Sequence, residues 1–166
     1  MANTQSMCTS FLGELMTATH NFGASPIRAA STADTFKAAL YLTTATINAA
    51  TTAYTATGEV SGTNYTAGGV TVTNATAPTS TNSSATAGVG YWTPSASIVY
   101  TTVTLSTAFD TVLIYNSTQS NKAVSVHTFG SQTITAGTFT LTMPSNTTTT
   151  ALLRLATTYC GGGVMP

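Results

Sequence analysis

Charged side chains are the scarcest feature of this sequence. Asp, Glu, Lys and Arg make up 5% of its 166 residues, whereas about 25% is usual for a globular domain. The four acidic and four basic residues give a formal net charge of zero. Because neutral copies of a molecule repel one another little, neutrality favours association. We therefore expect a chain that works in an assembly, with copies of itself among its partners.

Three further absences exclude classes of partner. No run of Lys or Arg is present that could neutralise phosphates, so we expect no nucleic-acid binding. No apolar stretch approaches the roughly 20 residues that a membrane span needs, so we expect no membrane partner. The N-terminus also lacks a basic region followed by an apolar core, and we expect no secretion signal and synthesis in a cytoplasm.

Groups that could carry out chemistry are few. No His-x-x-x-His spacing suggests a metal site, and no Gly-x-Ser-x-Gly segment suggests a hydrolase nucleophile. We predict no catalytic residue, no metal site, no cofactor and no enzymatic activity. We expect His127 to be a hydrogen-bonded wall residue, and Asp34 and Asp110 to accept backbone N–H groups at strand ends. The complete supply of carboxyl and imidazole groups is Glu14, Asp34, Glu59, Asp110, His20 and His127.

The two cysteines lie at opposite ends of the chain. Cys8 and Cys160 fit neither a close pair of metal ligands nor a dense disulfide framework. Two interpretations stay open: the thiols are unreactive, or they form a bridge within one subunit or between subunits, since the termini of a domain often lie close together.

Threonine dominates what is present. Its 40 residues favour extended backbone, because the branched β-carbon suits strands and the hydroxyl can bond across a sheet or face water. Disordered Thr/Ser-rich stalks have few aromatic residues, whereas this chain has 14, many of them in alternating runs. The composition therefore predicts a folded β protein.

The stretch Thr35–Thr73 is the one around which we expect the domain to be organised. Phe36, Ala38, Leu40 and Leu42 alternate with other residues, which predicts a strand with one apolar face. Gly62, Gly68 and Gly69 can adopt positive φ in a loop, and the alternation restarts at Val70 and Val72. Two strands joined by a long loop follow from this pattern.

The segments around this stretch divide the chain into an arm, one domain and a tail. Residues 1–10 show no periodicity and are predicted to be an arm, and residues 11–22 show helical spacing with Glu14 in the first turn and an end at Gly23. Residues 74–90 contain almost nothing that can be buried and are predicted to be an exposed loop inside a single domain, 11–158. Residues 159–166 are predicted to be a flexible tail.

The second half of the sequence reads as a series of strands. Alternation or continuous apolar character predicts strands over 95–106, 109–116, 122–129 and 132–143, with a last one at Leu152–Leu155. The strand 109–116 is apolar on both faces, so we expect it in the interior of a sheet. Short strands separated by polar turns, with one short helix, predict an all-β antiparallel sandwich or jelly roll.

Three aromatic residues are candidates for an interaction surface: Tyr65, Tyr91 and Trp92. The last two follow directly on the predicted exposed loop. For Trp92 a second role, packing in the core, is the stronger expectation, because an indole buries a large area.

The sequence resembles a family of small virion structural proteins of tailed bacteriophages. The resemblance is carried by Ala33–Leu42 and Thr52–Thr73, most specifically by Glu59-Val-Ser-Gly and Tyr65-Thr-Ala-Gly-Gly. Phe109–Asn116 and Phe139–Pro144 fit the same family. The resemblance implies a non-enzymatic particle component of the head decoration, cement or tail-associated type.

Two functions follow as expectations. The first is a capsid decoration or cement protein on the virion surface, which contacts the major capsid protein and copies of itself through symmetric multi-copy contacts. A low-charge, Thr-rich surface suits such contacts because few ions have to be desolvated. The second is a receptor- or glycan-binding module of the tail or of a head fibre. An enzyme acting on cell-surface polysaccharide is a distant third.

Overall fold

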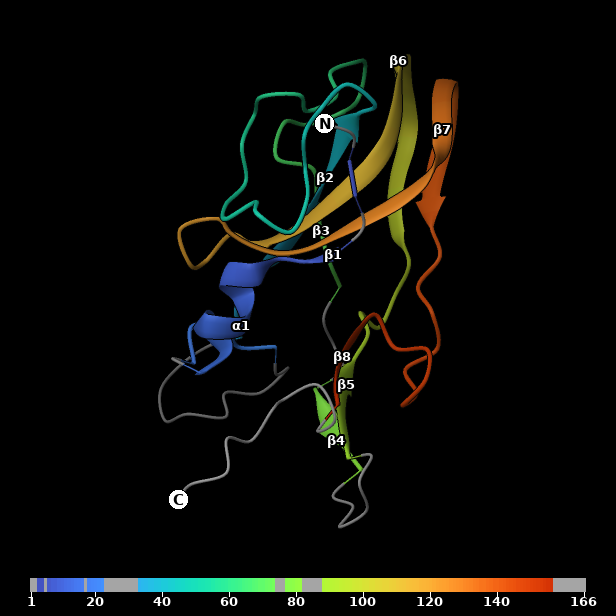
Figure 1. The fold of residues 1–166 in the computed structure, drawn as a ribbon. Coiled ribbons are helices and arrows are strands. Elements are labelled where there is room, and N and C mark those ends of the chain that lie inside the picture. The colour runs from blue at the N-terminus through green and yellow to red at the C-terminus, as the bar shows by residue number, and fades with distance from the viewer. Residues whose placement is uncertain are drawn as a thin grey trace, which may run out of the picture.

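The structure, a computed structural model, is all-β in character, with its strands in two antiparallel sheets (Figure 1). It describes residues 3–4, 6–16, 18–22, 33–73, 77–81 and 88–156. The five-stranded sheet has the order β1-β7-β6-β2-β3, and the three-stranded sheet has the order β4-β5-β8. The strands are β1 (Ser6–Met7), β2 (Phe36–Leu42), β3 (Val70–Thr71), β4 (Thr79–Ser80), β5 (Val89–Trp92), β6 (Ile98–Asn116), β7 (Lys122–Leu141) and β8 (Leu153–Ala156).

A long bent hairpin, β6 and β7, forms the centre of the large sheet. Figure 1 shows both strands changing direction near the top of the view, so that the hairpin folds back over the sheet. The pairing register shifts repeatedly between Tyr100 and Thr111, and Thr102 and Ala136 have positive φ at the bend. Such bulges bend a strand without ending it. The sequence predicted four strands here, and the structure has two.

The two strands expected on either side of the Gly-containing loop are confirmed, and they pair with each other. β2 pairs with β3 in antiparallel register, with Ala38 opposite Val70. Gly69 has φ +72°, and a β-carbon there would lie 1.7 Å from the carbonyl oxygen of Ala38. Both the backbone conformation and the close approach therefore require glycine.

Gly62 is needed for a different reason from the one expected. Its φ is not positive, but a β-carbon would lie 2.0 Å from the carbonyl oxygen of Thr104. The neighbouring Thr63 forms a bridge with Thr104, which draws the loop onto β6. Close packing of two backbones, rather than a turn, excludes a side chain at Gly62.

The prediction that β2 has one apolar face is wrong, because both faces are covered. Ala39 and Tyr41, on the face expected to be polar, are as fully buried as Phe36 and Leu40. The Tyr41 hydroxyl donates to the carbonyl of Thr55, 2.6 Å away, so the loop that follows β2 packs over this face. The strand segment 109–116 is buried almost throughout between β2 and β7, as its apolar sequence predicted.

Helix α1 (Thr9–Met16) lies near the N-terminus and ends earlier than the helical spacing over residues 11–22 indicated. Ala18 has φ +52°, and its N–H bonds to the carbonyl of Leu15. A left-handed residue after the last turn is a usual way to end a helix. Glu14 lies in the second half of α1 and not in its first turn, so the expected role with the helix dipole is wrong. The predicted end at Gly23 lies outside the described residues.

Parts of the predicted arm and loop carry regular structure. Ser6 and Met7 pair with β7, and Asn3 bonds to the backbone of Ile47 and Leu42, so the arm predicted over 1–10 is tied to the domain where it is described. Within the loop predicted over 74–90, Thr79–Ser80 forms β4 and pairs with β5. Residues 74–76, 82–87 and the predicted tail 159–166 lie outside the described residues.

One apolar core connects the two sheets. Trp92 and Leu153 of the small sheet belong to the same buried cluster as Phe36 of β2 and Phe109 of β6. The Trp92 ring lies 4.8 Å from that of Phe22 and 6.2 Å from that of Phe36, between ring centroids. Among the described residues, no helix has the length and apolar character needed to cross a membrane.

Candidate functional site

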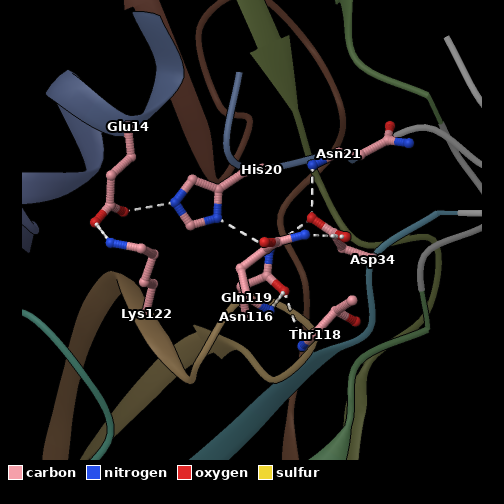
Figure 2. Close-up of polar contacts among 8 residues, drawn as sticks. All are labelled: Glu14, His20, Asn21, Asp34, Asn116, Thr118, Gln119 and Lys122. Carbon is pink, nitrogen blue, oxygen red and sulfur yellow. Dashed lines mark hydrogen bonds and ion pairs between the residues drawn. The ribbon is translucent and has the colours of Figure 1, made fainter. Parts of the chain in front are cut away.

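Three groups of described polar side chains are candidates for a site. The first, the N-terminal polar cluster, lies between the α1 region and the turn after β6 (Figure 2). The second, the Glu59 cluster, lies under the loop after β2. The third is a pair, Ser125 and His127, at a cavity beside β1. The N-terminal polar cluster consists of Glu14, His20, Asn21, Asp34, Asn116, Thr118, Gln119 and Lys122.

His20 is at the centre of the N-terminal polar cluster. Its Nε2 lies 2.7 Å from Oε2 of Glu14, and its Nδ1 lies 3.1 Å from the side-chain nitrogen of Asn116 (Figure 2). The Asn116 amide orientation is fixed, because its oxygen accepts the N–H groups of Thr118 and Gln119. Asn116 must therefore donate to Nδ1, while Nε2 donates to the carboxylate. The imidazole is neutral in this arrangement.

The two carboxylates of this cluster are held by several donors. Glu14 accepts from Lys122 Nζ at 2.6 Å as well as from His20. Burial alone would raise the pKa of Glu14, but the bonds from Lys122 and His20 outweigh it and lower that pKa. Asp34 accepts from the Asn116 side chain at 2.7 Å and from the backbone N–H of Asn21 at 2.9 Å. The expectation that Asp34 accepts a backbone N–H is confirmed.

These contacts connect parts of the chain that are distant in the sequence. The cluster joins α1 and residues 20–21 to the start of β2 and to the turn between β6 and β7. Asn116 is fully buried and His20 nearly so. The imidazole and both carboxylates form hydrogen bonds with other members of the cluster, which fits a structural role.

The Glu59 cluster binds one carboxylate with three donors. Glu59 accepts from the Tyr54 hydroxyl at 2.6 Å, from the Tyr65 hydroxyl at 2.7 Å and from the Gly68 N–H at 2.7 Å. The Tyr65 hydroxyl also accepts from the N–H of Leu40 in β2. Burial and the bond to Glu59 raise the pKa of Tyr54 to about 12 and that of Tyr65 further. The cluster therefore fixes the loop 43–69 to the sheet.

Ser125 and His127 lie two residues apart on β7, so both side chains point to one face. The Ser125 hydroxyl is 2.9 Å from His127 Nε2, and burial lowers the pKa of His127 to about 4. A base with so low a pKa takes up a proton poorly at neutral pH, so this pair is not well suited to activate a serine. The expected role of His127 as a hydrogen-bonded wall residue agrees with this geometry.

A cavity of about 380 Å³ opens beside that pair, between β1, β7 and β8. Arg154 and Thr148 lie on its wall, and the Arg154 guanidinium donates to the Thr148 carbonyl at 3.3 Å. Ser6 also lines it, and its hydroxyl is buried without a hydrogen-bond partner. The cavity is mixed in polarity.

The candidate interaction residues do not form one surface. Trp92 is only 2% exposed and packs in the core, which was the stronger expectation for it. Tyr65 is half-buried, and its hydroxyl is used in the Glu59 cluster. Tyr91 alone is placed for outside contact, in a small apolar groove of about 160 Å³ that also includes Leu155 and Pro78.

Comparison with known proteins assigns no family. No protein-family model matches the chain, and searches of curated proteins and of solved structures found no significant match.

The remaining candidate residues are Asp110 and the two cysteines. Asp110 accepts from the side chains of Asn3 and Thr111, at 2.8 and 2.7 Å, and from no backbone N–H group of the described residues, contrary to expectation. Cys8 is a buried free thiol whose pKa is raised to about 11 by burial and by Glu14. Cys160 lies outside the described residues. The described part of the chain contains no group of three or more His, Cys, Asp or Glu that could hold a metal ion.

Sequence reasoning missed the two clusters. Glu14 and Lys122 are 108 residues apart, and no local pattern indicates that they meet. Glu59 lies five and six residues from Tyr54 and Tyr65, so this cluster had a local signal: a single carboxylate between two tyrosines in a loop otherwise made of small residues.

Proposed function

We propose that this chain is a non-enzymatic structural protein of a bacteriophage virion, a capsid decoration or cement protein. It binds the major capsid protein and copies of itself on the surface of the head, in many equivalent positions. The observation that carries the proposal is that the acidic side chains are bonded to groups of the protein itself. All four carboxylates accept hydrogen bonds from inside the protein, in the two clusters and at Asp110.

The surface that remains is rich in uncharged hydroxyl groups. On the outer half of β7, the exposed residues include Thr133, Thr135, Thr138 and Thr140. Such a surface can form broad contacts without the desolvation of ions, which is the main cost of binding through charged groups. Proteins that bind at many equal sites usually do so as symmetric assemblies.

The proposal includes a sandwich-type arrangement of the β layers. In support of it, the two halves of the bent hairpin face each other: the Phe109 ring lies 5.2 Å from the Phe139 ring, between centroids. The Tyr100 hydroxyl, from the returning half, donates to the carbonyl of Ala38 in β2 at 2.8 Å. Two layers with aromatic residues between them are typical of a β-sandwich core.

The number of copies per purified particle tests this function. A cement protein is present in on the order of hundreds of copies, because it follows the symmetry of the shell. Quantitative mass spectrometry against the major capsid protein gives the ratio. A few copies, or a few dozen, would contradict the cement role and favour a tail or fibre component.

The cavity beside Ser125 and His127 favours a second candidate, a receptor- or glycan-binding module of a tail or head fibre. Its wall carries a guanidinium, an imidazole and hydroxyl groups, which are donors suited to a sugar bearing an acidic group. In this role the Arg154→Gln variant loses binding to host cells while remaining folded, and the exposed Thr57→Gln variant does not. Equal binding by both variants would remove the cavity from consideration.

A further inference from the structure

The outer edge of β7 is open over most of its length. β7 pairs with β6 from Lys122 to Leu141, but its other side pairs with β1 only at Ser125 and Val126. Beyond these residues, from Thr128 to Leu141, no described residue forms a ladder with that side. The edge accepts main-chain bonds where a partner is present, since the carbonyl of Val124 accepts the N–H of Cys8 at 3.0 Å.

Natural sheet edges are usually protected against pairing by charged side chains, by proline, by β-bulges or by short length. The segment from Thr128 to Leu141 contains no charged residue and no proline. The pairing of this segment with β6 shifts register repeatedly between Thr128 and Phe139, and Ala136 has φ +46°. Gly137–Leu141 follows the last extra residues of β7 itself, and its pairing with β6 is in regular register from Phe139 to Leu141.

Side chains along this stretch alternate in the way that a pairing strand requires. Thr138 and Thr140 are exposed, whereas Phe139 and Leu141 are half-buried and pack against the core. Threonine favours extended backbone and forms cross-strand pairs with threonine. A new strand would therefore find hydroxyl groups on the exposed face and would not disturb the core.

We infer that the β7 edge at Gly137–Leu141 binds the same edge of a second copy of this chain, in antiparallel pairing across a two-fold axis. An antiparallel strand pair is self-complementary, so one segment serves on both sides of an isologous interface. The lack of charge favours this occupant, because an edge with charges of one sign would repel its own copy. The inference deepens the proposed function and rests on it, because that function requires copies of the chain to associate.

Charge placed on the edge tests the pairing. In the Thr138→Lys/Thr140→Lys variant, like charges face one another across the axis, and dimerisation weakens by about tenfold or more. A matched control, Thr57→Lys/Thr66→Lys, adds the same charge at exposed positions of the loop after β2 and leaves the dimer unchanged. Sedimentation velocity over a range of concentrations measures the association of each variant.

Mixing variants separates pairing from misfolding. The Thr138→Glu/Thr140→Glu variant alone is also a weaker dimer, but an equimolar mixture with the Lys variant restores association, because opposite charges then meet. A wild-type chain that stays monomeric at every concentration would overturn the inference, as would a Lys variant that dimerises like the control. The inference would also be overturned if the mixture of the Glu and Lys variants associated no better than either variant alone.

The outcome is distinguishable from that of the proposed function. A chain that dimerises through this edge but is present in only a few copies per particle contradicts the cement role and leaves the interface intact. A chain present in many copies on the particle, whose edge variants associate normally, contradicts only the interface.

Discussion

Replacing Glu59 by Gln should lower the free energy of unfolding markedly, although it only exchanges a carboxylate oxygen for an amide group. The carboxylate accepts three hydrogen bonds, two from tyrosine hydroxyls and one from the N–H of Gly68. A Gln oxygen at the Oε1 position still accepts from Tyr65 and Gly68. The new amide group then faces Tyr54, whose hydroxyl has to turn and accept instead of donating.

The magnitude follows from the difference between charged and neutral acceptors. Hydrogen bonds to charged groups contribute about 1.5–3 kcal/mol, and neutral ones about 0.5–1.5 kcal/mol. Three bonds that each lose about 1 kcal/mol give an upper value of about 3 kcal/mol. Glu59 is half-buried, and solvent screens part of the effect, so we expect a loss of about 2 kcal/mol.

Urea denaturation followed by circular dichroism measures this loss as a change in the free energy of unfolding. The Tyr54→Phe variant removes one of the three bonds and should lose about 1 kcal/mol. In the double variant the two losses should not add, because both changes affect the same bond. If Glu59→Gln unfolds within about 0.5 kcal/mol of the wild type, the Glu59 cluster does not hold the loop on the sheet.

Three further predictions concern single residues. Because the pKa of His127 is lowered from 6.5 to about 4, the unfolded chain takes up a proton before the folded one does. Stability should therefore fall as the pH drops from 6.5 to 4, by about 3 kcal/mol at most, and the pH dependence should be flatter in His127→Gln. Gly69→Ala places a β-carbon against the carbonyl of Ala38 in β2 and should cost about 3 kcal/mol or more, measured by thermal unfolding; a change below about 1 kcal/mol would contradict the close approach. Cys8 is fully buried with a pKa raised to about 11, so in the Cys160→Ser chain a thiol reagent should react only after unfolding, and rapid reaction of the native chain would contradict this.

Less of the candidate site than of the fold could be predicted from the sequence. Local position indicated that His127, at the end of an apolar alternation, and Asp34, just before a strand, are hydrogen-bonded parts of the structure, and both have such bonds. A polar group must find a partner when it is buried. The partners themselves could not be read from the sequence. His20, Asn116 and Asp34 meet only after three distant segments have packed together.

The sequence by itself determined that this is a β protein with very few ionisable groups, and it placed the strands β2 and β3 on either side of a Gly-containing loop. Both follow from local properties, namely branched side chains, alternation and glycines with positive φ at a loop. Only the tertiary structure decided that β6 and β7 are single bent strands, that Tyr41 is buried, and that the edge of β7 is open. Bulges, coverage of a second face and unpaired edges depend on which distant segments pack together, and a period of two residues carries no information about that.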